Sequence, residues 1–359
     1  MSLPTTARRP SLLDTSMQFG TALLRLFPAE LAHDIGMWML ERDLLKLLPL
    51  PSFGSGLDGL TMNIPGIGEL AHPIGLAAGF DKNARAPHGF ARMGLSFLEL
   101  GTITPRPQLG NPKPRLFRLD DQMGLINRMG FNSEGAAVVA DRLQRKRWNH
   151  NPIPLGINLG KNKDTEIDAA IEDYSQGIET FAPHAKYFVI NVSSPNTAGL
   201  RGLANEHFLK ELGMRHKNEL SKLWVKLDPD MKKRDFQGLV EALANIGFQG
   251  LVLTNTHRVE QPQAGGMSGP AIAAQSTACL EWAHEVTKGR LPLIASGGIL
   301  SGQDVFQRIA RGASAVQIYS ALVYRGPLAV YSMIAELRNE MALRGFSFLS
   351  DVKGSYYND

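Results

Sequence analysis

Short apolar runs alternate with amphipathic stretches from residue 72 onward. Eight apolar runs have the length of buried strands, at residues 74–78, 97–100, 153–159, 187–192, 223–227, 250–254, 292–295 and 315–319. Between them, apolar residues recur at helical spacing in residues 134–147, 166–181, 236–246, 275–288 and 302–310. Strand–helix alternation is typical of a parallel sheet, and eight repeats predict a closed (β/α)8 TIM barrel, an α/β fold.

Two segments depart from this alternation. Residues 1–50 predict two helices, 13–27 and 29–48, separated by Pro28. Their apolar arc is too wide to bury within so small a unit, so it packs either on the barrel or against a membrane. Residues 49–59 read as a linker. Residues 104–127 are too long for an ordinary loop and contain two strand-like runs, which predicts a β-hairpin inserted at the barrel mouth.

Composition narrows the class of protein. The 359 residues are 43% hydrophobic, with 36 glycines and 21 prolines, which excludes disordered and fibrous chains. The net charge is only +4, and no basic run exceeds residues 142–147, so we expect no nucleic-acid partner. Cys279 is the only cysteine, which excludes an intrachain disulfide and a cysteine-based zinc site. No run of 18 apolar residues and no signal-peptide pattern stand out, so we expect a soluble or peripheral protein.

The residues that follow the eight apolar runs carry the candidate chemistry, because reactive groups of TIM barrels lie at the C-terminal ends of the strands. These positions hold amides, hydroxyls, glycines and two lysines, with no carboxylate pair and no histidine cluster. Such side chains suit a planar polar heterocycle gripped by its edges. The glycines after the seventh run and the residues after the eighth suit a phosphate, since bare backbone N–H groups can approach it closely.

Lys226 is the most informative single residue, because it interrupts the apolar strand sequence Leu-Trp-Val-Lys-Leu. Burying a lysine without an anionic partner is costly. Its partner is either a carboxylate in the barrel lumen or a bound group, such as a reduced flavin or a phosphate.

Nine motifs then follow one another in a fixed order between residues 74 and 320. They are FDKN, GTITPRPQLGNPKPRLFRL, INRMGFNS, GINLGKNKDT, NVSSPNT, TNT, GGMSG, SGGI and QIYS. Together they resemble the dihydroorotate dehydrogenase family, and the N-terminal helical pair resembles the extension of its quinone-dependent class 2. The resemblance implies oxidation of (S)-dihydroorotate to orotate, with one FMN per chain as hydride acceptor and a membrane quinone as final electron acceptor. The reaction belongs to de novo pyrimidine (UMP) biosynthesis.

The resemblance also implies roles for individual residues. Ser194 matches the catalytic base, which is serine in the quinone-linked class and cysteine in cytosolic relatives, and Cys279 lies far from it. Thr197 and Phe131 match a proton relay. Substrate binding is implied for Lys82, Asn127, Arg128, Met129, Gly130, Phe131, Asn191, Asn196, Asn255 and Thr256. FMN binding is implied for Ala78, Gly79, Lys82, Thr102, Asn158, Asn191, Lys226, Thr254, Gly269, Gly298, Tyr319 and Ser320. A quinone tunnel is implied for His33, Arg118 and Tyr319.

The same resemblance organises the chain into four parts. Residues 1–50 would be a helical extension for membrane contact and quinone access, 51–71 a linker and the barrel bottom, and 72–345 the FMN-binding barrel. Residues 346–359 form a tail that matches nothing in the family pattern. We expect no metal, a monomer, and peripheral attachment to the cytoplasmic face of a bacterial inner membrane, with the mitochondrial inner membrane as the alternative.

One stretch departs from the family pattern. Residues 256–265 are shorter than the loop in many relatives, and Pro270 follows Gly269 where a basic residue is often found. Two other functions remain open from the sequence. An FMN barrel acting on a different pyrimidine would share the amide-rich mouth, and a non-redox phosphate-binding barrel would share the glycines. Flavin colour that bleaches with dihydroorotate would distinguish a dihydroorotate dehydrogenase from both of these alternatives.

Overall fold

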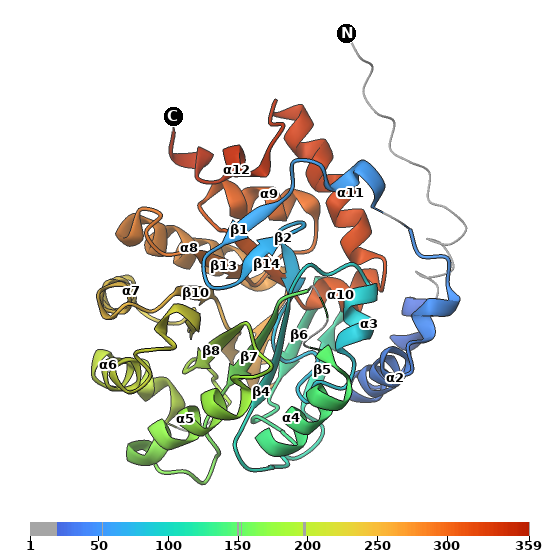
Figure 1. The fold of residues 1–359 in the computed structure, drawn as a ribbon. Coiled ribbons are helices and arrows are strands. Elements are labelled where there is room, and N and C mark those ends of the chain that lie inside the picture. The colour runs from blue at the N-terminus through green and yellow to red at the C-terminus, as the bar shows by residue number, and fades with distance from the viewer. Residues whose placement is uncertain (1–19, 52, 149–150, 152, 197–198, 359) are drawn as a thin grey trace.

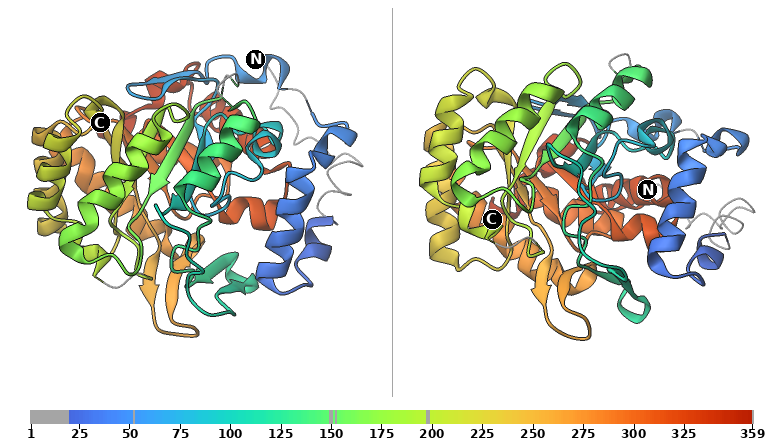
Figure 2. Two further views of the ribbon diagram at one scale, coloured as in Figure 1. Left: turned by 60° about the horizontal axis from the view of Figure 1, so that its bottom comes forward. Right: turned by 90° about the horizontal axis from the view of Figure 1, so that it is seen from below.

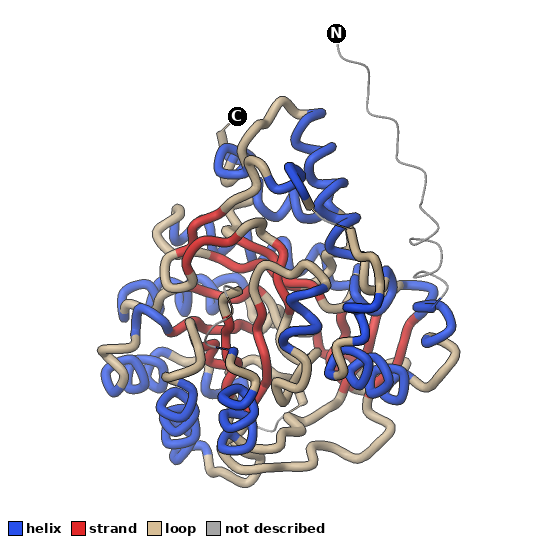
Figure 3. Tube along the Cα trace, turned by 45° about the vertical axis from the view of Figure 1, so that its right-hand side comes forward, coloured by secondary structure: helices blue, strands red, loops and turns tan. Residues whose placement is uncertain are grey.

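The computed structural model describes residues 20–51, 53–148, 151, 153–196 and 199–358. Its centre is a closed barrel of eight parallel strands surrounded by helices (Figures 1 and 3). Around the barrel the strands are β3 (Ile74–Leu76), β4 (Leu98–Ile103), β7 (Leu155–Leu159), β8 (Tyr187–Asn191), β9 (Leu223–Leu227), β10 (Gly250–Leu253), β13 (Leu293–Ser296) and β14 (Ala315–Ile318). Each overlaps one of the eight predicted runs, with β4 and β13 ending beyond theirs, so the predicted TIM barrel is confirmed.

Helices connect successive barrel strands and cover the outside of the barrel. They are α3 (Pro87–Arg92), α4 (Ala136–Arg145), α5 (Ala170–Phe181), α6 (Glu206–Arg215), α7 (Lys233–Ile246), α8 (Ala273–Thr287), α9 (Gly302–Ala310), α10 (Ser320–Arg325) and α11 (Ala329–Leu343). Their apolar faces join the outward-facing strand residues in one large core. The five predicted helical stretches correspond to α4, α5, α7, α8 and α9, with ends shifted by a few residues.

The N-terminal helices lie against one side of the barrel, next to α3 and a hairpin at the mouth (Figure 2). Residues 20–24 are helical, and the rest of the predicted helix 13–27 before residue 20 lies outside the described residues. The predicted helix 29–48 is divided into α2 (Ala29–Glu41) and a 3-10 turn at Leu44–Leu47. Asp43 breaks it, because it takes a left-handed conformation with φ 53° and accepts hydrogen bonds from Arg92.

Two hairpins join at the barrel mouth. The predicted one is β5 (Leu116–Leu119) with β6 (Gly124–Asn127), which confirms the insertion in residues 104–127. A second hairpin, β11 (His257–Val259) with β12 (Gly265–Ser268), was not predicted. Because β12 pairs with β6, the four strands form one sheet in the order β11-β12-β6-β5. Figure 2 shows both hairpins projecting from the same end of the barrel.

The opposite end of the barrel is closed by apolar side chains. A short hairpin, β1 (Met62–Ile64) with β2 (Gly68–Leu70), packs Ile64, Ile67 and Leu70 against lumen residues such as Tyr187 and Trp224. The C-terminal tail, which had no predicted structure, forms α12 (Leu349–Val352) and a 3-10 turn at Ser355–Tyr357. Its helix is anchored by buried apolar side chains and by a backbone hydrogen bond to Gly59. The lumen is therefore apolar at its base, and its polar side chains lie in the half toward the mouth.

Candidate active site

A buried carboxylate organises the polar half of the barrel lumen. Glu99 on β4 is fully buried, and it accepts hydrogen bonds from Asn158 Nδ2 (2.7 Å) and Gln317 Nε2 (2.5 Å). Lys226 Nζ lies 3.8 Å from Glu99 Oε1, close enough for an ion pair and too far for a hydrogen bond. Among the described residues Lys226 donates no hydrogen bond to the protein, while its side chain lines the mouth pocket described below. The lysine therefore has a lumen carboxylate as partner and still presents its donors to the mouth.

Amides and hydroxyls form a second layer of hydrogen bonds above this pair. Thr102 Oγ1 donates to Asn158 Oδ1 (2.5 Å), and Asn191 Nδ2 donates to both Thr102 Oγ1 (2.9 Å) and Asn158 Oδ1 (3.0 Å). Asn255 Nδ2 reaches Asn191 Oδ1 at 3.3 Å and Ser193 Oγ at 3.0 Å. These bonds connect the ends of β4, β7, β8 and β10, so the side chains that face the mouth are fixed before any ligand binds.

The mouth pocket lies directly above this network and encloses about 1090 Å³, part of it open to solvent. Most of the predicted substrate and cofactor residues line it, namely Ala78, Gly79, Lys82, Thr102, Asn127, Met129, Gly130, Phe131, Asn191, Ser194, Asn196, Lys226, Thr254, Asn255, Thr256, Gly269, Gly298, Tyr319 and Ser320. Their meeting in one pocket brings together segments from all parts of the barrel sequence. Thr197 lies outside the described residues.

Two predicted residues do not reach the pocket surface. Asn158 is fully buried and supports Thr102 and Asn191 from below. Arg128 turns its side chain away, since its Nε donates to Pro114 O (3.1 Å) and its guanidinium lies 5.0 Å from the centre of the Phe117 ring. Only the backbone at residue 128 remains near the predicted substrate segment.

Ser194 follows the end of β8 and is 6% exposed. The backbone N–H of Asn196 donates to its Oγ at 3.2 Å, and no carboxylate or imidazole of the described residues is hydrogen-bonded to it. The hydroxyl proton can therefore point into the pocket. Phe131, which faces the same pocket, has a left-handed backbone with φ 53°. A conformation that an aromatic residue rarely adopts indicates that the surrounding segment is strongly constrained.

The side chains of Lys82 and Asn127 provide the charge and the amide expected for an acidic ligand. Lys82 Nζ donates to Gly79 O at 2.7 Å. Burial, reinforced by Arg115, lowers the pKa of Lys82 to about 8, and Glu30 is among the acidic groups that oppose this shift. At neutral pH the amine is thus still mainly protonated. Asn127 Oδ1 accepts from Asn196 Nδ2 (3.2 Å), which ties the hairpin to the segment that carries Ser194.

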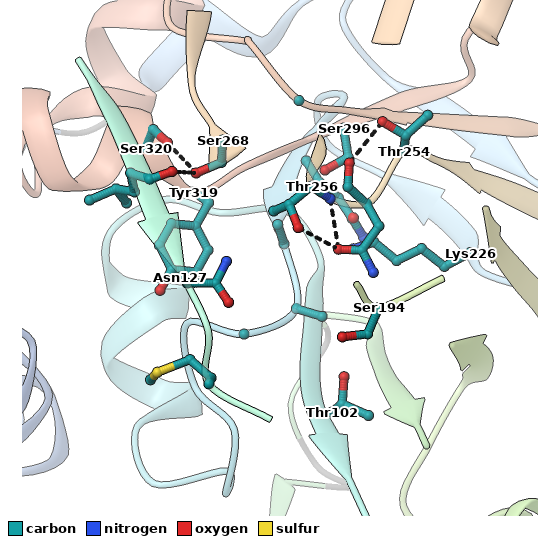
Figure 4. Close-up of a pocket in the computed structure, with 18 of the residues that line it drawn as sticks. Thr102, Asn127, Ser194, Lys226, Thr254, Thr256, Ser268, Ser296, Tyr319 and Ser320 are labelled. Atoms are coloured by element: carbon teal, nitrogen blue, oxygen red, sulfur yellow. Dashed lines mark hydrogen bonds between the residues drawn. The ribbon is translucent and has the colours of Figure 1, made fainter. Parts of the chain in front are cut away.

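Glycines and hydroxyls gather at one end of the pocket. In Figure 4, Ser268, Tyr319 and Ser320 lie together, away from Ser194, Lys226 and Thr102, and Ser268 Oγ is 3.4 Å from Ser320 Oγ. Gly298 has φ 72°, and a Cβ there would lie 2.5 Å from Cα and Cβ of Ala273. Only glycine therefore fits this turn, which leaves its backbone at the pocket wall.

The donor set fits the FMN implied by the sequence. The glycine and hydroxyl end offers a phosphate backbone N–H groups and O–H groups without a carboxylate. The other end offers a lysine, amides and threonines to the edges of a ring. Gln317 Oε1 is buried at the pocket with no hydrogen-bond partner among the described residues, so a ligand N–H would satisfy it. The pocket is lined from the glycine and hydroxyl end to Ser194 and Asn196, so a second, smaller ring compound would bind at the Ser194 end.

A second, mainly apolar pocket lies between the N-terminal helices and the barrel. We call it the side pocket; it encloses about 940 Å³. The three predicted tunnel residues, His33, Arg118 and Tyr319, all line it. Leu116, Leu125 and Tyr319 line the mouth pocket as well, so the two pockets share a wall.

Aromatic rings and two arginines shape the side pocket. Phe80 stands between His33 (ring centres 5.2 Å apart) and Tyr319 (4.8 Å). Arg118 Nη2 donates to the backbone oxygens of Arg25 (2.6 Å) and Phe27. Nε of both arginines is buried without a hydrogen-bond partner among the described residues. Burial, with a smaller contribution from Lys82, lowers the pKa of His33 to about 3, so its imidazole is neutral.

Sequence reasoning missed Glu99, Gln317 and Phe80. Each carried a signal, since Glu99 and Gln317 are polar residues inside otherwise apolar strands and Phe80 lies within the motif FDKN. Residues two apart in a strand face the same side, so Glu99 faces the lumen as Phe97 does. This alternation would have placed Glu99 inside the barrel.

Neither a metal centre nor a membrane-spanning helix is found among the described residues. No three or more histidine, cysteine, aspartate or glutamate side chains meet in a way that could hold a metal ion. No described helix combines the length and apolar character needed to cross a bilayer.

The chain is similar to known proteins over most of its length. The family model for dihydroorotate dehydrogenase matches residues 59–341. The chain is 39% identical over 351 residues to a dihydroorotate dehydrogenase (quinone) of Myxococcus xanthus, covering 93% of this chain and 96% of that protein. It is 38% identical to the mitochondrial dihydroorotate dehydrogenase (quinone) of Mus musculus, covering 93% and 88%. A crystal structure of DHODH from Eimeria tenella in complex with ferulenol superposes with a TM-score of 0.84 at 38% identity, covering 92% and 96%.

Proposed function

The chain belongs to the quinone-dependent dihydroorotate dehydrogenase family, and on that premise we propose that it converts (S)-dihydroorotate to orotate with FMN as its cofactor, in de novo pyrimidine biosynthesis. It is an oxidoreductase whose family members pass electrons from dihydroorotate to a quinone. The finer assignments below rest on the two pockets and on the residues that line them.

We propose that one FMN binds in the mouth pocket. When bound, FMN would accept a hydride from dihydroorotate and pass the electrons on to the quinone. Its phosphate would be held at the glycine and hydroxyl end, by Gly269, Gly298, Tyr319 and Ser320. Its ring and ribityl chain would contact the residues Ala78, Gly79, Lys82, Thr102, Asn191, Lys226 and Thr254, which line the same pocket. Asn158 would act only indirectly, through its hydrogen bonds to Thr102 and Asn191.

Dihydroorotate would occupy the part of the pocket next to Ser194. Lys82 carries the positive charge that an acidic substrate needs, and Asn127 lines the same pocket. Asparagine side chains offer a donor and an acceptor side by side, which suits the ring N–H and C=O groups of a pyrimidine. Asn191, Asn196, Asn255 and Thr256 would supply these contacts, with the backbone of residues 128–131 alongside.

Ser194 would take the proton from C5 of dihydroorotate. A serine hydroxyl is a weak base at neutral pH, so it must release its own proton as it accepts the substrate proton. Among the described residues its oxygen accepts one backbone hydrogen bond, from Asn196 N–H, which leaves the hydroxyl proton free to move toward water. Phe131 would shape the path, and Thr197, outside the described residues, is the second member of the proposed relay.

We propose that the quinone enters through the side pocket. The wall is apolar, as a quinone requires, and His33 and the two arginines add a few polar groups. The buried Nε atoms of Arg25 and Arg118 have no hydrogen-bond partner among the described residues, with Asp120 Oδ2 3.9 Å from Arg118 Nε, and they suit the carbonyl oxygens of a quinone. Tyr319 borders both pockets and would separate the quinone from the flavin.

The outer face of the N-terminal helices would rest on a membrane. Several large apolar side chains are exposed there, namely Leu23, Leu26, Phe27, Leu31, Trp38 and Leu47. An exposed apolar face beside an apolar pocket suits peripheral attachment to a bilayer that supplies the quinone. We propose the cytoplasmic face of a bacterial inner membrane, with the mitochondrial inner membrane as the alternative, and a monomer as the functional unit.

The observation that carries this proposal is the convergence of Ser194, Lys82 and the asparagines on one pocket that also has an end rich in glycines and hydroxyls. Purified protein should carry flavin colour that bleaches when dihydroorotate is added. Ser194→Ala should keep the flavin and bleach at least about 100-fold more slowly, the usual loss when a general base is removed.

Ser193→Ala is the matched control, because the Ser193 hydroxyl faces Asn191 and Asn255 and does not line the pocket. It should slow bleaching far less than Ser194→Ala. Protein that neither carries nor binds FMN would contradict the cofactor assignment, and native bleaching by Ser194→Ala would contradict the role of the serine.

A further inference from the structure

One buried arginine connects the N-terminal helices to the substrate side of the barrel mouth. Arg115 directly precedes β5 and is 9% exposed. Its Nε and Nη2 lie 3.0 and 2.9 Å from Oε1 of Glu30, which is in the first turn of α2. Lys113 also reaches Glu30 (3.2 Å), but its side chain is 64% exposed, so this contact is screened by water.

The other side of Arg115 holds the backbone of the mouth. Its Nη1 donates to Leu109 O (2.6 Å) and Asn111 O (3.2 Å), and its backbone oxygen accepts from Arg128 N (2.9 Å). The side chain of Arg115 thus contacts α2 and the loop at residues 109–111, and its backbone contacts Arg128, directly after β6. Glu30 lies about 80 to 100 residues before the loop and the β6 end that it meets through Arg115.

Asn111 extends this connection into the predicted substrate segment, residues 127–131. Its backbone N–H donates to Met129 O (2.9 Å), and its Nδ2 donates to Arg128 O (3.0 Å). The packing is tight, since a Cβ on Gly130 would lie 2.7 Å from Asn111 Cγ. A shift of residue 111 must therefore displace residues 128–130, three of the residues that border the proposed dihydroorotate site.

We propose that the Glu30–Arg115 ion pair couples the two pockets, so that docking of α2 at the side pocket holds residues 127–131 in their substrate-binding arrangement. Arg115 is a positioning residue in this account and touches no substrate. The inference rests on the proposed function, because it takes residues 127–131 as the orotate-binding segment. Glu30 also raises the pKa of Lys82, whereas Arg115 lowers it. Glu30 thus also helps to keep the substrate-side lysine charged.

The coupling would depend on Glu30 because it is the carboxylate partner of the Arg115 guanidinium. The side chains of Arg115 and Glu30 are 10% and 16% exposed, so the pair is shielded from water. Without the carboxylate, the guanidinium would have only backbone oxygens and a nearby lysine around it. It would turn toward solvent and release the oxygens of Leu109 and Asn111, and residues 128–130 would lose their support.

The test measures orotate binding to the FMN-loaded full-length enzyme by titration of the flavin spectrum. Glu30→Gln should raise the Kd for orotate about tenfold, within the 5- to 150-fold range usual for coupled sites. Glu30→Asp should recover part of the affinity. In turnover, Glu30→Gln should raise KM for dihydroorotate more than it lowers kcat, and hydrogen exchange should speed up in residues 109–111 and 127–131.

Asp43→Asn is the matched control. It breaks the Asp43–Arg92 ion pair (2.8 Å), which also ties the N-terminal segment to the barrel, but at α3 and away from residues 109–131. It should change the Kd for orotate less than twofold. An equal effect of Asp43→Asn would mean general loosening of the N-terminal helices and would overturn the proposal, as would an orotate Kd within twofold of wild type for Glu30→Gln.

A reciprocal measurement needs no variant. Coupling of binding free energies is mutual, so saturating orotate should tighten binding of decylubiquinone to the wild-type holoenzyme by a similar factor. If orotate leaves the decylubiquinone Kd unchanged, the coupling is refuted even if Glu30→Gln fails to fold. A holoenzyme that bound no orotate would instead overturn the proposed function, and the coupling with it.

Discussion

Neutralising Glu99 should destabilise the barrel more than any surface substitution of the same kind. The carboxylate is fully buried, receives two amide hydrogen bonds and lies 3.8 Å from Lys226 Nζ. In Glu99→Gln the new amide can accept from only one of the two donors, and its own NH2 faces the other. One hydrogen bond to a charged acceptor is lost, a contribution of about 1.5–3 kcal/mol.

The loss of the charge adds to this. Two unit charges about 4 Å apart attract by roughly 4 kcal/mol at an effective dielectric constant of about 20, and part of that is offset because a buried charge has lost its hydration. Removing one member of a buried pair typically costs 3–5 kcal/mol in total. We therefore expect Glu99→Gln to lower the free energy of unfolding by about 3–5 kcal/mol.

Urea denaturation followed by tryptophan fluorescence measures this change, since Trp224 lies in the lumen two residues before Lys226. Glu134→Gln, which breaks a partly exposed pair with Arg142, is the control and should change stability by less than about 1 kcal/mol. Adding Lys226→Met to Glu99→Gln removes both charges and should cost less than the sum of the two single changes. A Glu99→Gln protein within 1 kcal/mol of wild type would refute the reasoning.

Two further outcomes are expected. His72 accepts a hydrogen bond from Ile74 N (3.2 Å) and faces Gly94 O (2.8 Å), and burial lowers its pKa from 6.5 to about 4. Between those values the unfolded chain binds a proton that the folded chain does not, so stability falls as pH falls, by about 2 kcal/mol from pH 7 to pH 5. His72→Asn should flatten that part of the profile in urea titrations at the two pH values, and an unchanged slope would contradict this. Gly298→Ala should lower stability by about 2 kcal/mol and weaken FMN retention, measured by thermal melting and by flavin content after gel filtration, because its backbone is left-handed and Ala273 occupies the space of a Cβ.

The sequence predicted the barrel because each buried parallel strand is a short apolar run, and eight such runs are hard to arrange otherwise. It predicted most of the mouth because the polar residues at strand ends meet wherever the strands close. Ser194, Lys82 and Lys226 all line one pocket as this argument requires. Their individual roles came from motif resemblance and are still predictions.

What the sequence did not reveal depends on contacts between distant segments. The hairpin of β11 and β12 is short, contains Gly265 and Gly266, and is held by β6, about 140 residues earlier. The break after α2 depends on Asp43 meeting Arg92 of α3. Nothing in the sequence near Arg115 distinguishes it from other loop arginines. Its ion pair with Glu30 is visible only in the fold. Local propensity carries no information about such pairs.

Leu116, Leu125 and Tyr319 line both pockets and form the wall that the two pockets share. A water-soluble acid and a lipid-soluble ring compound can therefore reside in adjoining chambers at the same time without displacing one another. In kinetic terms, neither reactant should act as a competitive inhibitor of the other. On the proposed function, only a few side chains would then separate the water-soluble substrate from the lipid-soluble quinone.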